Sequence, residues 1–261
     1  MDYILESACN LELQAESERQ KQLLQVQRKG ELALNQSCHP MFFFERKLWD
    51  DGVFFVAGID EAGRGPIAGP VVAAAVIVPR DTMFPPVNDS KKLTDKQRRV
   101  LRDAIMSISG LLFSIVEVSV REVERINILK ATHSAMIRAM QNLKVAEFAL
   151  IDGLPVPRFP FPSQAIIRGD SKSASIAAAS ILAKVYRDDL MKKYSVQYPQ
   201  YGFEKHKGYG TIFHMEALKK YGPCSIHRRT FAPVRDLIEK SEKIQPELNL
   251  MVGGSAVDVS D

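Results

Sequence analysis

The sequence predicts an α/β fold in which one sheet of mixed strand direction is flanked by helices. In the first half of the chain, short apolar runs are separated by turns that contain glycine, which is typical of strands joined by short connections. Farther along, strand-like runs alternate with long helical patterns, which is typical of β–helix–β units. Together these two patterns favour a sheet with both antiparallel and parallel neighbours, followed by a helical C-terminal segment.

Five apolar runs are the expected strands. The first two are VFFVAGI and VVAAAVIV, with a glycine-rich turn between them, and the third is LLFSIVEVSV, whose residues alternate in polarity. The fourth and fifth are EFALID and QAIIRGD, each of which ends in an aspartate. In chain order the expected strands are therefore residues 53–59, 71–78, 111–120, 147–152 and 164–170.

Three helices are expected around this sheet. One covers residues 123–143, a long one begins at about Ser171, and a shorter one runs through FHMEALKKYG. The long helix is rich in alanine, and small side chains of this kind allow a helix to pack closely on a sheet. Core candidates in the first helix are Ile128, Ala131, Ala135 and Met136.

The two ends of the chain differ from its middle. Residues 11–29 are rich in helix formers and contain no Gly or Pro, so we expect a polar helix that ends at Gly30. Residues 239–261 have few apolar side chains to bury, and we expect a flexible tail there. The expected organisation is an N-terminal helical extension at 1–50, a main domain at 51–238 and this tail.

Charge is distributed unevenly along the 261 residues. The formal net charge of +4 combines a net −2 in residues 1–50, a net +10 in residues 51–235 and a net −4 in residues 236–261. A basic body with acidic ends suits a polyanionic partner such as nucleic acid. Ordinary surface charge that keeps the protein in solution is an equally good explanation of this pattern by itself.

The apolar runs, the first residues and the cysteines indicate the cellular location to expect. The longest apolar run, VVAAAVIV, is far too short to span a bilayer, and the first ten residues lack the pattern of a secretory leader. The three cysteines, Cys9, Cys38 and Cys224, are an odd number without metal-ligand spacing, so we expect reduced thiols. We therefore expect a cytoplasmic protein with no membrane partner.

Four carboxylates follow or end the expected strands. Asp60 and Glu61 come after the first strand, Asp152 ends the fourth and Asp170 ends the fifth. If these strands are neighbours, the four acids gather at one edge of the sheet, where their repulsion would raise some of their pKa values unless cations offset it. Taken singly, each acid is better explained as a turn or helix-cap residue, Asp170 in particular.

The ligand types favour a hard divalent cation at this edge. Mg²⁺ prefers oxygen ligands and commonly binds one or two carboxylates together with a substrate phosphate. No His or Cys joins the pattern, which argues against zinc. A pair of such cations supports hydrolysis of a phosphodiester by in-line displacement.

The turn after Glu61 contains Gly63, Gly65 and Gly69. It is not a dinucleotide fingerprint, because Pro66 follows directly and the next run is a strand, and no GxxxxGK[ST] motif occurs in the chain. Two explanations stay open: a tight hairpin, or close approach of the backbone to a ligand, with Arg64 available for a phosphate.

Further motifs lie downstream. The polar start of the long helix, SKS after Asp170, is a favourable place for phosphate if a helix N-terminus lies there. The segment YGFEKHKGYGT mixes aromatic and basic residues around glycines, which suits stacking beside a nucleic-acid backbone, although this signal is weak by itself.

Several long motifs in order resemble the type 2 ribonuclease H family, the ribonuclease HII proteins of bacteria. The resemblance runs from about Phe55 to Leu237. The motifs are GIDEAGRGPIAGPVVAAAVI, NDSKKLT, INILKATHSAM, LIDG, GDSKSASIAAASILAKVYRD, KHKGYGT and HRRTFAPV.

This resemblance implies a ribonuclease H-like fold and assigns roles to residues. The four acids, Asp60, Glu61, Asp152 and Asp170, match the family's catalytic metal ligands, and two Mg²⁺ or Mn²⁺ ions are expected during catalysis. Gly63, Arg64 and Gly65 match the stretch that contacts the 2′-hydroxyl side of the ribonucleotide, which is how a protein distinguishes RNA from DNA. Tyr209 resembles the tyrosine that packs on the deoxyribose just 3′ to an RNA–DNA junction. Expected contacts to backbone phosphates are Lys91, Lys92, Ser171 and Lys172.

The resemblance implies an endonuclease that cuts the RNA strand of RNA–DNA hybrids and nicks 5′ of a ribonucleotide embedded in duplex DNA. It would leave 3′-hydroxyl and 5′-phosphate ends, and we expect a monomer. Two other functions remain open: a DNA nuclease or strand-transfer enzyme with the same metal chemistry, and a non-catalytic nucleic-acid-binding module. The ribose-recognition residues argue against the first, and the four acids argue against the second.

Overall fold

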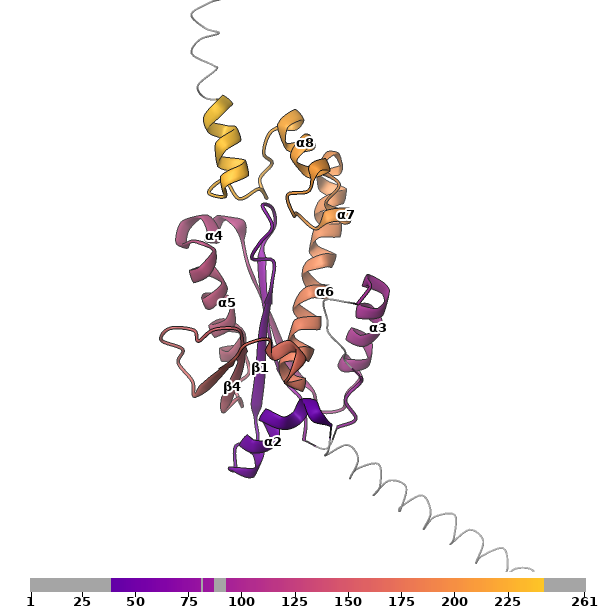
Figure 1. Ribbon diagram of the computed structural model, residues 1–261, viewed down its shortest axis with the longest axis vertical. Coiled ribbons are helices and arrows are strands. Elements are labelled where there is room, and N and C mark those ends of the chain that lie inside the picture. Colours follow the sequence, from indigo (N-terminus) through magenta and orange to yellow (C-terminus); the bar gives the residue numbers. More distant parts are fainter. Residues whose placement is uncertain (1–38, 81, 87–92, 242–261) are drawn as a thin grey trace, which may run out of the picture.

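The computed structural model describes residues 39–80, 82–86 and 93–241 and centres on one five-stranded sheet (Figure 1). The order of strands is β3-β2-β1-β4-β5, with antiparallel pairing of β1 to β2 and β2 to β3 and parallel pairing of β1 to β4 and β4 to β5. The predicted sheet of mixed direction is confirmed. Its strands are β1 (Val56–Ala62), β2 (Val71–Ile77), β3 (Leu112–Val118), β4 (Phe148–Asp152) and β5 (Ser163–Ile166).

Helices cover both faces of the sheet, so the central strands are buried on two sides. One face packs against α2 (Phe43–Asp50), α3 (Asp95–Met106) and α6 (Ala174–Gln197), and the other packs against α4 (Val120–Ile126) and α5 (Ile128–Asn142). Strand β2 shows why its sequence is continuously apolar. Val72, Ala74 and Val76 enter the first core, whereas the residues between them enter the second, as the two-residue period of a strand requires.

Helix α6 packs closely against strand β1. A Cβ atom at Gly58 would clash with the backbone of Ser175 and Ile176, so only glycine allows this approach. The alanines expected to pack on the sheet are buried and belong to the same core as Val56. Because β1 carries two of the predicted acids, the packing of α6 sets the position of the site.

Two predicted boundaries around the acids are wrong. Strand β1 begins and ends three residues later than expected, and Asp60 and Glu61 lie within the strand near its end, where they pair with β2. Strand β5 ends at Ile166, and Asp170 lies in a 3₁₀ turn, η3 (Gly169–Ser171), which follows the left-handed residue Arg168. The residue that caps α6 is Ser173, whose hydroxyl accepts from the backbone N–H of Ile176.

The single helix predicted over residues 123–143 is two helices. Asn127 interrupts it with a φ of 69°, a positive value that residues other than glycine rarely adopt. The Asn127 side chain then caps α5 by accepting from the N–H of Lys130 at 3.0 Å. Of the predicted core residues in this segment, Ala131, Ala135 and Met136 are buried, and Ile128 packs against the same core from its edge.

The segment before β1 is part of the main body. A 3₁₀ turn, η1 (Pro40–Phe42), leads into α2, and Phe42 and Trp49 are buried in the core with α6. The Glu45 carboxylate accepts from the Ser173 hydroxyl at 2.6 Å and from the Ser175 N–H at 2.9 Å, so it joins α2 to the start of α6. The helix expected at residues 11–29 lies outside the described residues.

The C-terminal part is helical, as predicted. It contains η4 (Pro199–Tyr201), α7 (Phe203–His206), α8 (Ile212–Tyr221) and a helix over residues 232–241. The tail expected from residue 239 therefore starts inside that last helix, and its remainder lies outside the described residues. Within the described ranges, no helix combines the length and the apolar character needed to cross a bilayer.

Candidate active site

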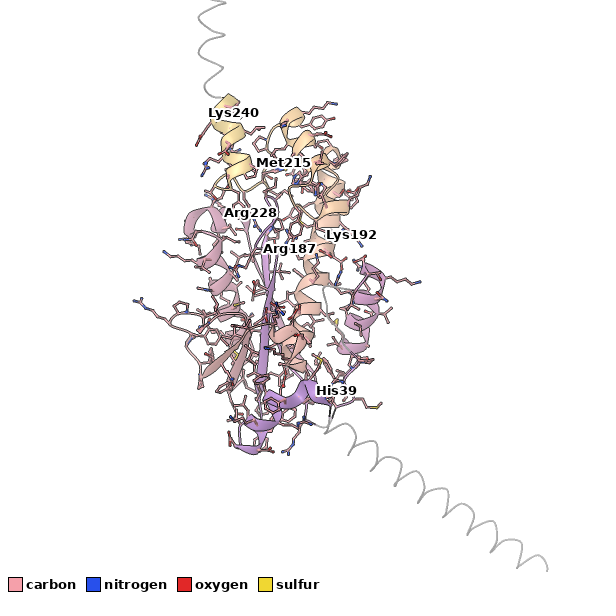
Figure 2. All side chains as sticks on the ribbon, viewed as in Figure 1. His39, Arg187, Lys192, Met215, Arg228 and Lys240 are labelled. Atoms are coloured by element: carbon pink, nitrogen blue, oxygen red, sulfur yellow. The ribbon has the colours of Figure 1, made fainter. Side chains whose placement is uncertain are left out.

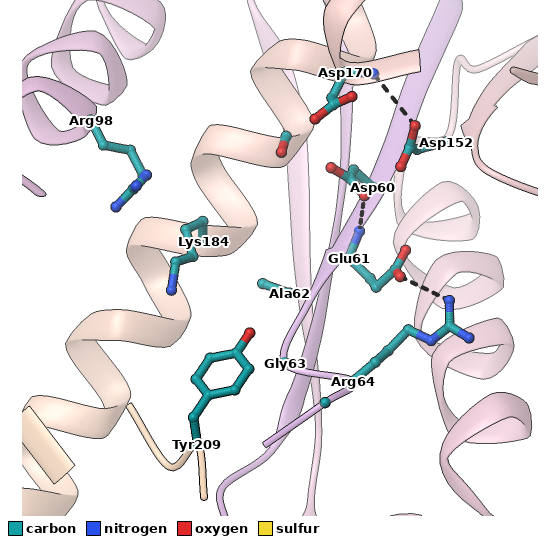
Figure 3. Close-up of a pocket in the computed structure, with 12 residues that line it drawn as sticks. Asp60, Glu61, Ala62, Gly63, Arg64, Arg98, Asp152, Asp170, Lys184 and Tyr209 are labelled. Atoms are coloured by element: carbon teal, nitrogen blue, oxygen red, sulfur yellow. Dashed lines mark hydrogen bonds and ion pairs between the residues drawn. The ribbon is translucent and has the colours of Figure 1, made fainter. Parts of the chain in front are cut away.

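A single pocket of about 450 Å³ brings most of the predicted site residues together (Figure 3). Its walls come from β1, from the turn after β1, from the ends of β4 and η3, from α3 and α6, and from the loop before α8. The lining residues are Asp60, Glu61, Ala62, Gly63, Arg64, Gly65, Arg98, Asp152, Asp170, Ser180, Lys184 and Tyr209. Ser171 and Lys172 are exposed next to Asp170 but do not line the pocket, and Lys91 and Lys92 lie outside the described residues.

The four acids meet because of the strand order. Strands β1 and β4 are parallel neighbours in which Ile59 pairs with Ile151, so Asp60 and Asp152 follow side by side. The backbone N–H groups of Gly169 and Asp170 donate to Oδ1 of Asp152 at 2.6 and 3.4 Å, which draws η3 against the end of β4. The predicted gathering of the acids at one edge is therefore observed, although Asp170 reaches it from a 3₁₀ turn.

Burial and mutual repulsion destabilise the ionised acids. The pKa of Asp60 is raised well above its ordinary value, first by burial and then by the negative charges of Glu61 and Asp152. Burial also raises the pKa of Glu61, although an ion pair with Arg64 at 3.2 Å acts in the opposite direction. Positive charge supplied from outside the protein would relieve both effects.

The donor set fits a hard divalent cation. Every acidic ligand offers oxygen, and no His or Cys lines the pocket. Within the described part of the chain, no three His, Cys, Asp or Glu side chains form a group that could hold a metal ion by themselves. Mg²⁺ and similar ions commonly take one or two carboxylates and complete their shell with water and substrate phosphate, so the acids would hold such an ion together with the substrate.

The opposite wall of the pocket is basic, and sequence reasoning missed it. Arg98 extends from α3 and donates to the carbonyl of Leu93 at 2.8 Å, and Lys184 extends from α6 and donates to Asp188 at 2.7 Å. No local motif marks Arg98. Lys184 lies one helical turn after Ser180 on the same face of α6, a spacing that could have indicated it.

The glycine turn connects β1 to β2 and depends on glycine at Gly63. Its φ of 97° is strained for other residues, and a Cβ atom there would clash with the side chain of Arg187. At Gly65 a Cβ atom would lie 3.5 Å from Cε1 of Tyr209, so this glycine lies directly beside the tyrosine ring. The turn is therefore a hairpin between antiparallel strands, although the loop over residues 63–70 is longer than the tight hairpin of the first explanation. Gly63, Arg64 and Gly65 line the pocket, and close approach to a ligand stays a prediction.

Tyr209 is held through its backbone, and the residue is 47% exposed. Its carbonyl accepts from Nδ1 of His214 at 2.8 Å, and Nε2 of His214 lies 3.0 Å from Nε2 of His227. Nδ1 of His227 in turn accepts from the N–H of Cys224. Burial lowers the pKa of both His214 and His227 to about 4, so this chain of hydrogen bonds is neutral near pH 7.

Comparisons with known proteins point to one family. The family model described as Ribonuclease HII matches residues 57–234. A curated protein named Ribonuclease HII from Chlamydia caviae is 54% identical over 196 residues, which cover 75% of this chain and 92% of that protein.

Solved structures agree. The ribonuclease H2 of Pyrococcus horikoshii superimposes with a TM-score of 0.61 at 27% identity, covering 72% of this chain and 99% of that one. The RNase HII of Archaeoglobus fulgidus, solved in a complex with PCNA, has a TM-score of 0.57 at 25% identity and covers 70% of this chain and 96% of that one. Since the family match extends over most of the chain and the fold agrees, the chain belongs to the ribonuclease HII family and is a hydrolase of the endoribonuclease class.

Proposed function

We propose that this protein hydrolyses the RNA strand of RNA–DNA hybrids and also nicks duplex DNA on the 5′ side of an embedded ribonucleotide. The products would carry 3′-hydroxyl and 5′-phosphate ends. The observation that carries this proposal is that one pocket combines four carboxylates with a glycine turn and an exposed tyrosine. The first group suits phosphodiester chemistry, and the second suits recognition of a sugar.

The four acids are the proposed ligands of two divalent cations, Mg²⁺ or Mn²⁺. When bound, these cations would supply Lewis-acid stabilisation of the charge that develops around the scissile phosphate. The protein contributes the rigid placement of the oxygens: Asp60 from β1 and Asp152 from the neighbouring β4. Asp170 is held next to them by the bond from the N–H of Gly169 to Asp152.

The basic wall would hold the nucleic-acid backbone. Arg98 and Lys184 line the pocket opposite the acids, so phosphates beside the scissile bond would lie between negative and positive walls. Arg64 lies at the pocket rim, where its guanidinium pairs with Glu61 and could exchange this partner for a phosphate. Additional backbone contacts are proposed for Lys91, Lys92, Ser171 and Lys172.

Recognition of the ribonucleotide is assigned to the turn and the tyrosine. The backbone of Gly63, Arg64 and Gly65 would contact the 2′-hydroxyl, the group that distinguishes RNA from DNA. The Tyr209 ring would pack on the next deoxyribose in the 3′ direction. The short distance between Gly65 and this ring supports contacts with two successive sugars. We also propose that the protein acts as a monomer.

The test uses a labelled DNA duplex with one ribonucleotide, a long RNA–DNA hybrid and an all-DNA duplex, each incubated with Mg²⁺. We expect one nick 5′ of the ribonucleotide, loss of cleavage in Asp152→Asn and reduced nicking of the single-ribonucleotide duplex in Tyr209→Ala. Matched controls are Asp236→Asn and Tyr221→Ala, which change exposed residues outside the pocket. Equal cutting of the all-DNA duplex would instead identify a DNA nuclease, and cleavage by Asp152→Asn at the wild-type rate would refute the assignment of the acids.

A further inference from the structure

Two arginines are fully buried beneath the glycine turn (Figure 2). Arg187 comes from α6 and is 1% exposed, and Arg228 follows the loop after α8 and is 0% exposed. Among the described residues, neither guanidinium forms an ion pair with a carboxylate. A buried charge without a counter-ion is costly, so the groups that replace its hydration have to be strong hydrogen-bond acceptors.

Those acceptors are carbonyl groups of the turn. Arg228 donates to the carbonyls of Gly63 at 2.6 Å, Pro66 at 2.7 Å, Gly69 at 2.9 Å and Arg64 at 3.0 Å. Figure 2 shows the two arginines in the interior near one end of β1.

Arg187 completes the arrangement and links it to a second segment. It donates to the carbonyls of Pro70 at 3.0 Å, Ala68 at 3.1 Å and Lys207 at 3.0 Å, and Lys207 is two residues before Tyr209. The backbone N–H of Arg228 binds the carbonyl of Ile67. Arg187 and Arg228 therefore donate hydrogen bonds to nearly every carbonyl of residues 63–70. Through the carbonyl of Lys207, Arg187 also connects this turn to the loop that carries Tyr209.

The direction of these carbonyls determines the direction of the amides. In a trans peptide the C=O and the following N–H point in opposite directions, and the described residues contain no cis bond. The unit that joins Pro66 to Ile67 shows the rule: its carbonyl faces Arg228, and its N–H donates to the carbonyl of Gly208 at 3.0 Å on the other side.

The same rule applies to the two preceding units. The carbonyls of Gly63 and Arg64 face Arg228, so the N–H groups of Arg64 and Gly65 face away from it. Neither N–H has an acceptor among the described residues, and both residues are exposed and line the pocket. Two neighbouring backbone donors are thus presented on the side where a ligand would lie.

We propose that Arg228, together with Arg187, is a positioning residue for ribose recognition. It holds the turn from below so that the amides of Arg64 and Gly65 form a fixed pair of donors for the oxygen of a 2′-hydroxyl. This inference rests on the proposed function and adds to it the residues that determine selectivity for a ribonucleotide. Arginine is required because its planar group presents five N–H donors in a rigid fork, whereas lysine offers only a single point charge.

The experiment compares two affinities in the inactive Asp152→Asn background, so that no substrate is consumed. One duplex contains a single ribonucleotide, and the other has the same sequence entirely as DNA. We expect Arg228→Lys to reduce the preference for the ribonucleotide duplex about tenfold, since loss of an oriented hydrogen bond costs about 1.4 kcal/mol. Affinity for the all-DNA duplex should stay within about twofold of the parent. Arg235→Lys, an exposed site, is the matched control.

A second variant and a direct observation cover the case in which Arg228→Lys does not fold. Phe231→Leu removes the ring that lies 5.0 Å from the Arg228 guanidinium but keeps every hydrogen-bond donor, so it should lower the preference by a smaller factor. In ¹⁵N-labelled parent protein, the amide signals of Arg64 and Gly65 should shift more with the ribonucleotide duplex than with the DNA duplex.

The outcomes separate this inference from the proposed function. If the parent protein prefers the ribonucleotide duplex and the folded variants keep that full preference, the positioning role of Arg228 is refuted alone. Identical responses of both amide signals to the two duplexes would also refute it. If the parent protein shows no preference at all, ribose recognition by the turn is refuted, and the positioning role with it.

Discussion

The pocket has an acidic half, made by the four carboxylates, and a glycine-turn half, made by residues 63–70. The two halves differ in how their charges are balanced. In the acidic half, Asp60 and Glu61 are brought together against repulsion, and burial raises both of their pKa values. In the glycine-turn half, two buried arginines bind the turn's carbonyls, so charge and backbone satisfy each other within the protein. The acidic half would therefore need cations from solution to offset its charge, whereas the carbonyls of the turn half are already satisfied in the free protein.

This difference indicates that the two halves of the pocket serve different steps, catalysis and substrate selection. In a cluster of carboxylates, mutual repulsion disfavours the ionised forms. A bound cation would relieve that repulsion, which favours binding of a metal together with a phosphate. A turn with fixed carbonyls requires no rearrangement when a ligand arrives, which favours selectivity for one sugar over another. We infer that the first half performs the chemistry and the second selects the substrate.

The largest effect is expected from Asp60→Asn. Loss of this carboxylate should lower the cleavage rate by about a thousandfold or more, because it removes several kcal/mol of charge stabilisation in the transition state. In metal-free buffer the same variant should melt a few degrees higher than the parent, since one repelling charge is gone. Single-turnover cleavage and thermal melting measure the two effects. If Asp60→Asn cleaved at the parent's rate, the catalytic role proposed for the acidic half would be wrong.

The next effect is the response of stability to pH and Mg²⁺. Because the pKa values of Asp60 and Glu61 are higher in the folded protein, the native state holds these protons more tightly than the unfolded chain does. Their contribution to stability is thus complete below the unfolded pKa and is lost as pH rises through the folded pKa. Above that window, Mg²⁺ at about 100 times its Kd should restore about 2.7 kcal/mol.

Thermal melting with and without Mg²⁺ across this pH range checks that prediction. The stabilisation should be much smaller in Asp60→Asn, which retains fewer ligands, and unchanged in Asp236→Asn. Equal stabilisation of the parent and Asp60→Asn would show that Mg²⁺ acts elsewhere on the molecule.

A moderate effect is expected at the turn. In Gly65→Ala the new methyl group would meet the Tyr209 ring at an ordinary contact distance of 3.5 Å, so folding should be preserved. The methyl group would nevertheless occupy the side where the sugar is expected, so the single-ribonucleotide duplex should bind less tightly and its cleavage at subsaturating enzyme should fall about tenfold. Kinetics and a melting curve test this together. A lower melting temperature with normal kinetics would mean that Gly65 has a role in folding only.

The smallest effect concerns the histidines behind Tyr209. The pKa of His214 and of His227 is about 4 in the folded protein, below the ordinary value, so the unfolded chain binds protons first as pH falls. The contribution of these two histidines to stability should therefore decrease from about pH 6.5 toward pH 4, opposite in sign to that of Asp60 and Glu61, and by itself it would lower the melting temperature by about a few degrees. His227→Gln should reduce this slope relative to the parent, and an unchanged slope would exclude His227 as its origin.

The sequence predicted the fold and the acids well because both depend on local patterns. Apolar runs marked the sheet, and an aspartate or glutamate near each strand end marked its edge. Local reasoning was wrong where the backbone made an irregular step: Asn127 splits one expected helix, and Arg168 leads into the 3₁₀ turn that holds Asp170. Helix α3 was missed because most of its residues are charged or polar, although Thr94 and Gln97 form a capping box at its start.

The residues that support the site could not be identified from local patterns. Arg228 is 165 positions from Gly63, and its bonds depend on how the C-terminal helices fold back onto the turn. Arg98 and Lys184 approach the pocket from two different helices. Only the resemblance to ribonuclease HII directed attention to Tyr209, since one tyrosine in an aromatic and basic loop is a weak signal by itself.

The division of work can be tested by measuring two quantities on the same two variants. For Asp60→Asn and Gly65→Ala we would determine the single-turnover cleavage rate with Mg²⁺ and the ratio of affinities for single-ribonucleotide and all-DNA duplexes, the latter without cleavage. We expect Asp60→Asn to lose the rate but keep the affinity ratio, and Gly65→Ala to lose much of the ratio but keep cleavage of duplex that it has bound. If each variant instead lost both quantities in the same proportion, the two halves would act as one unit and their proposed separation would be wrong.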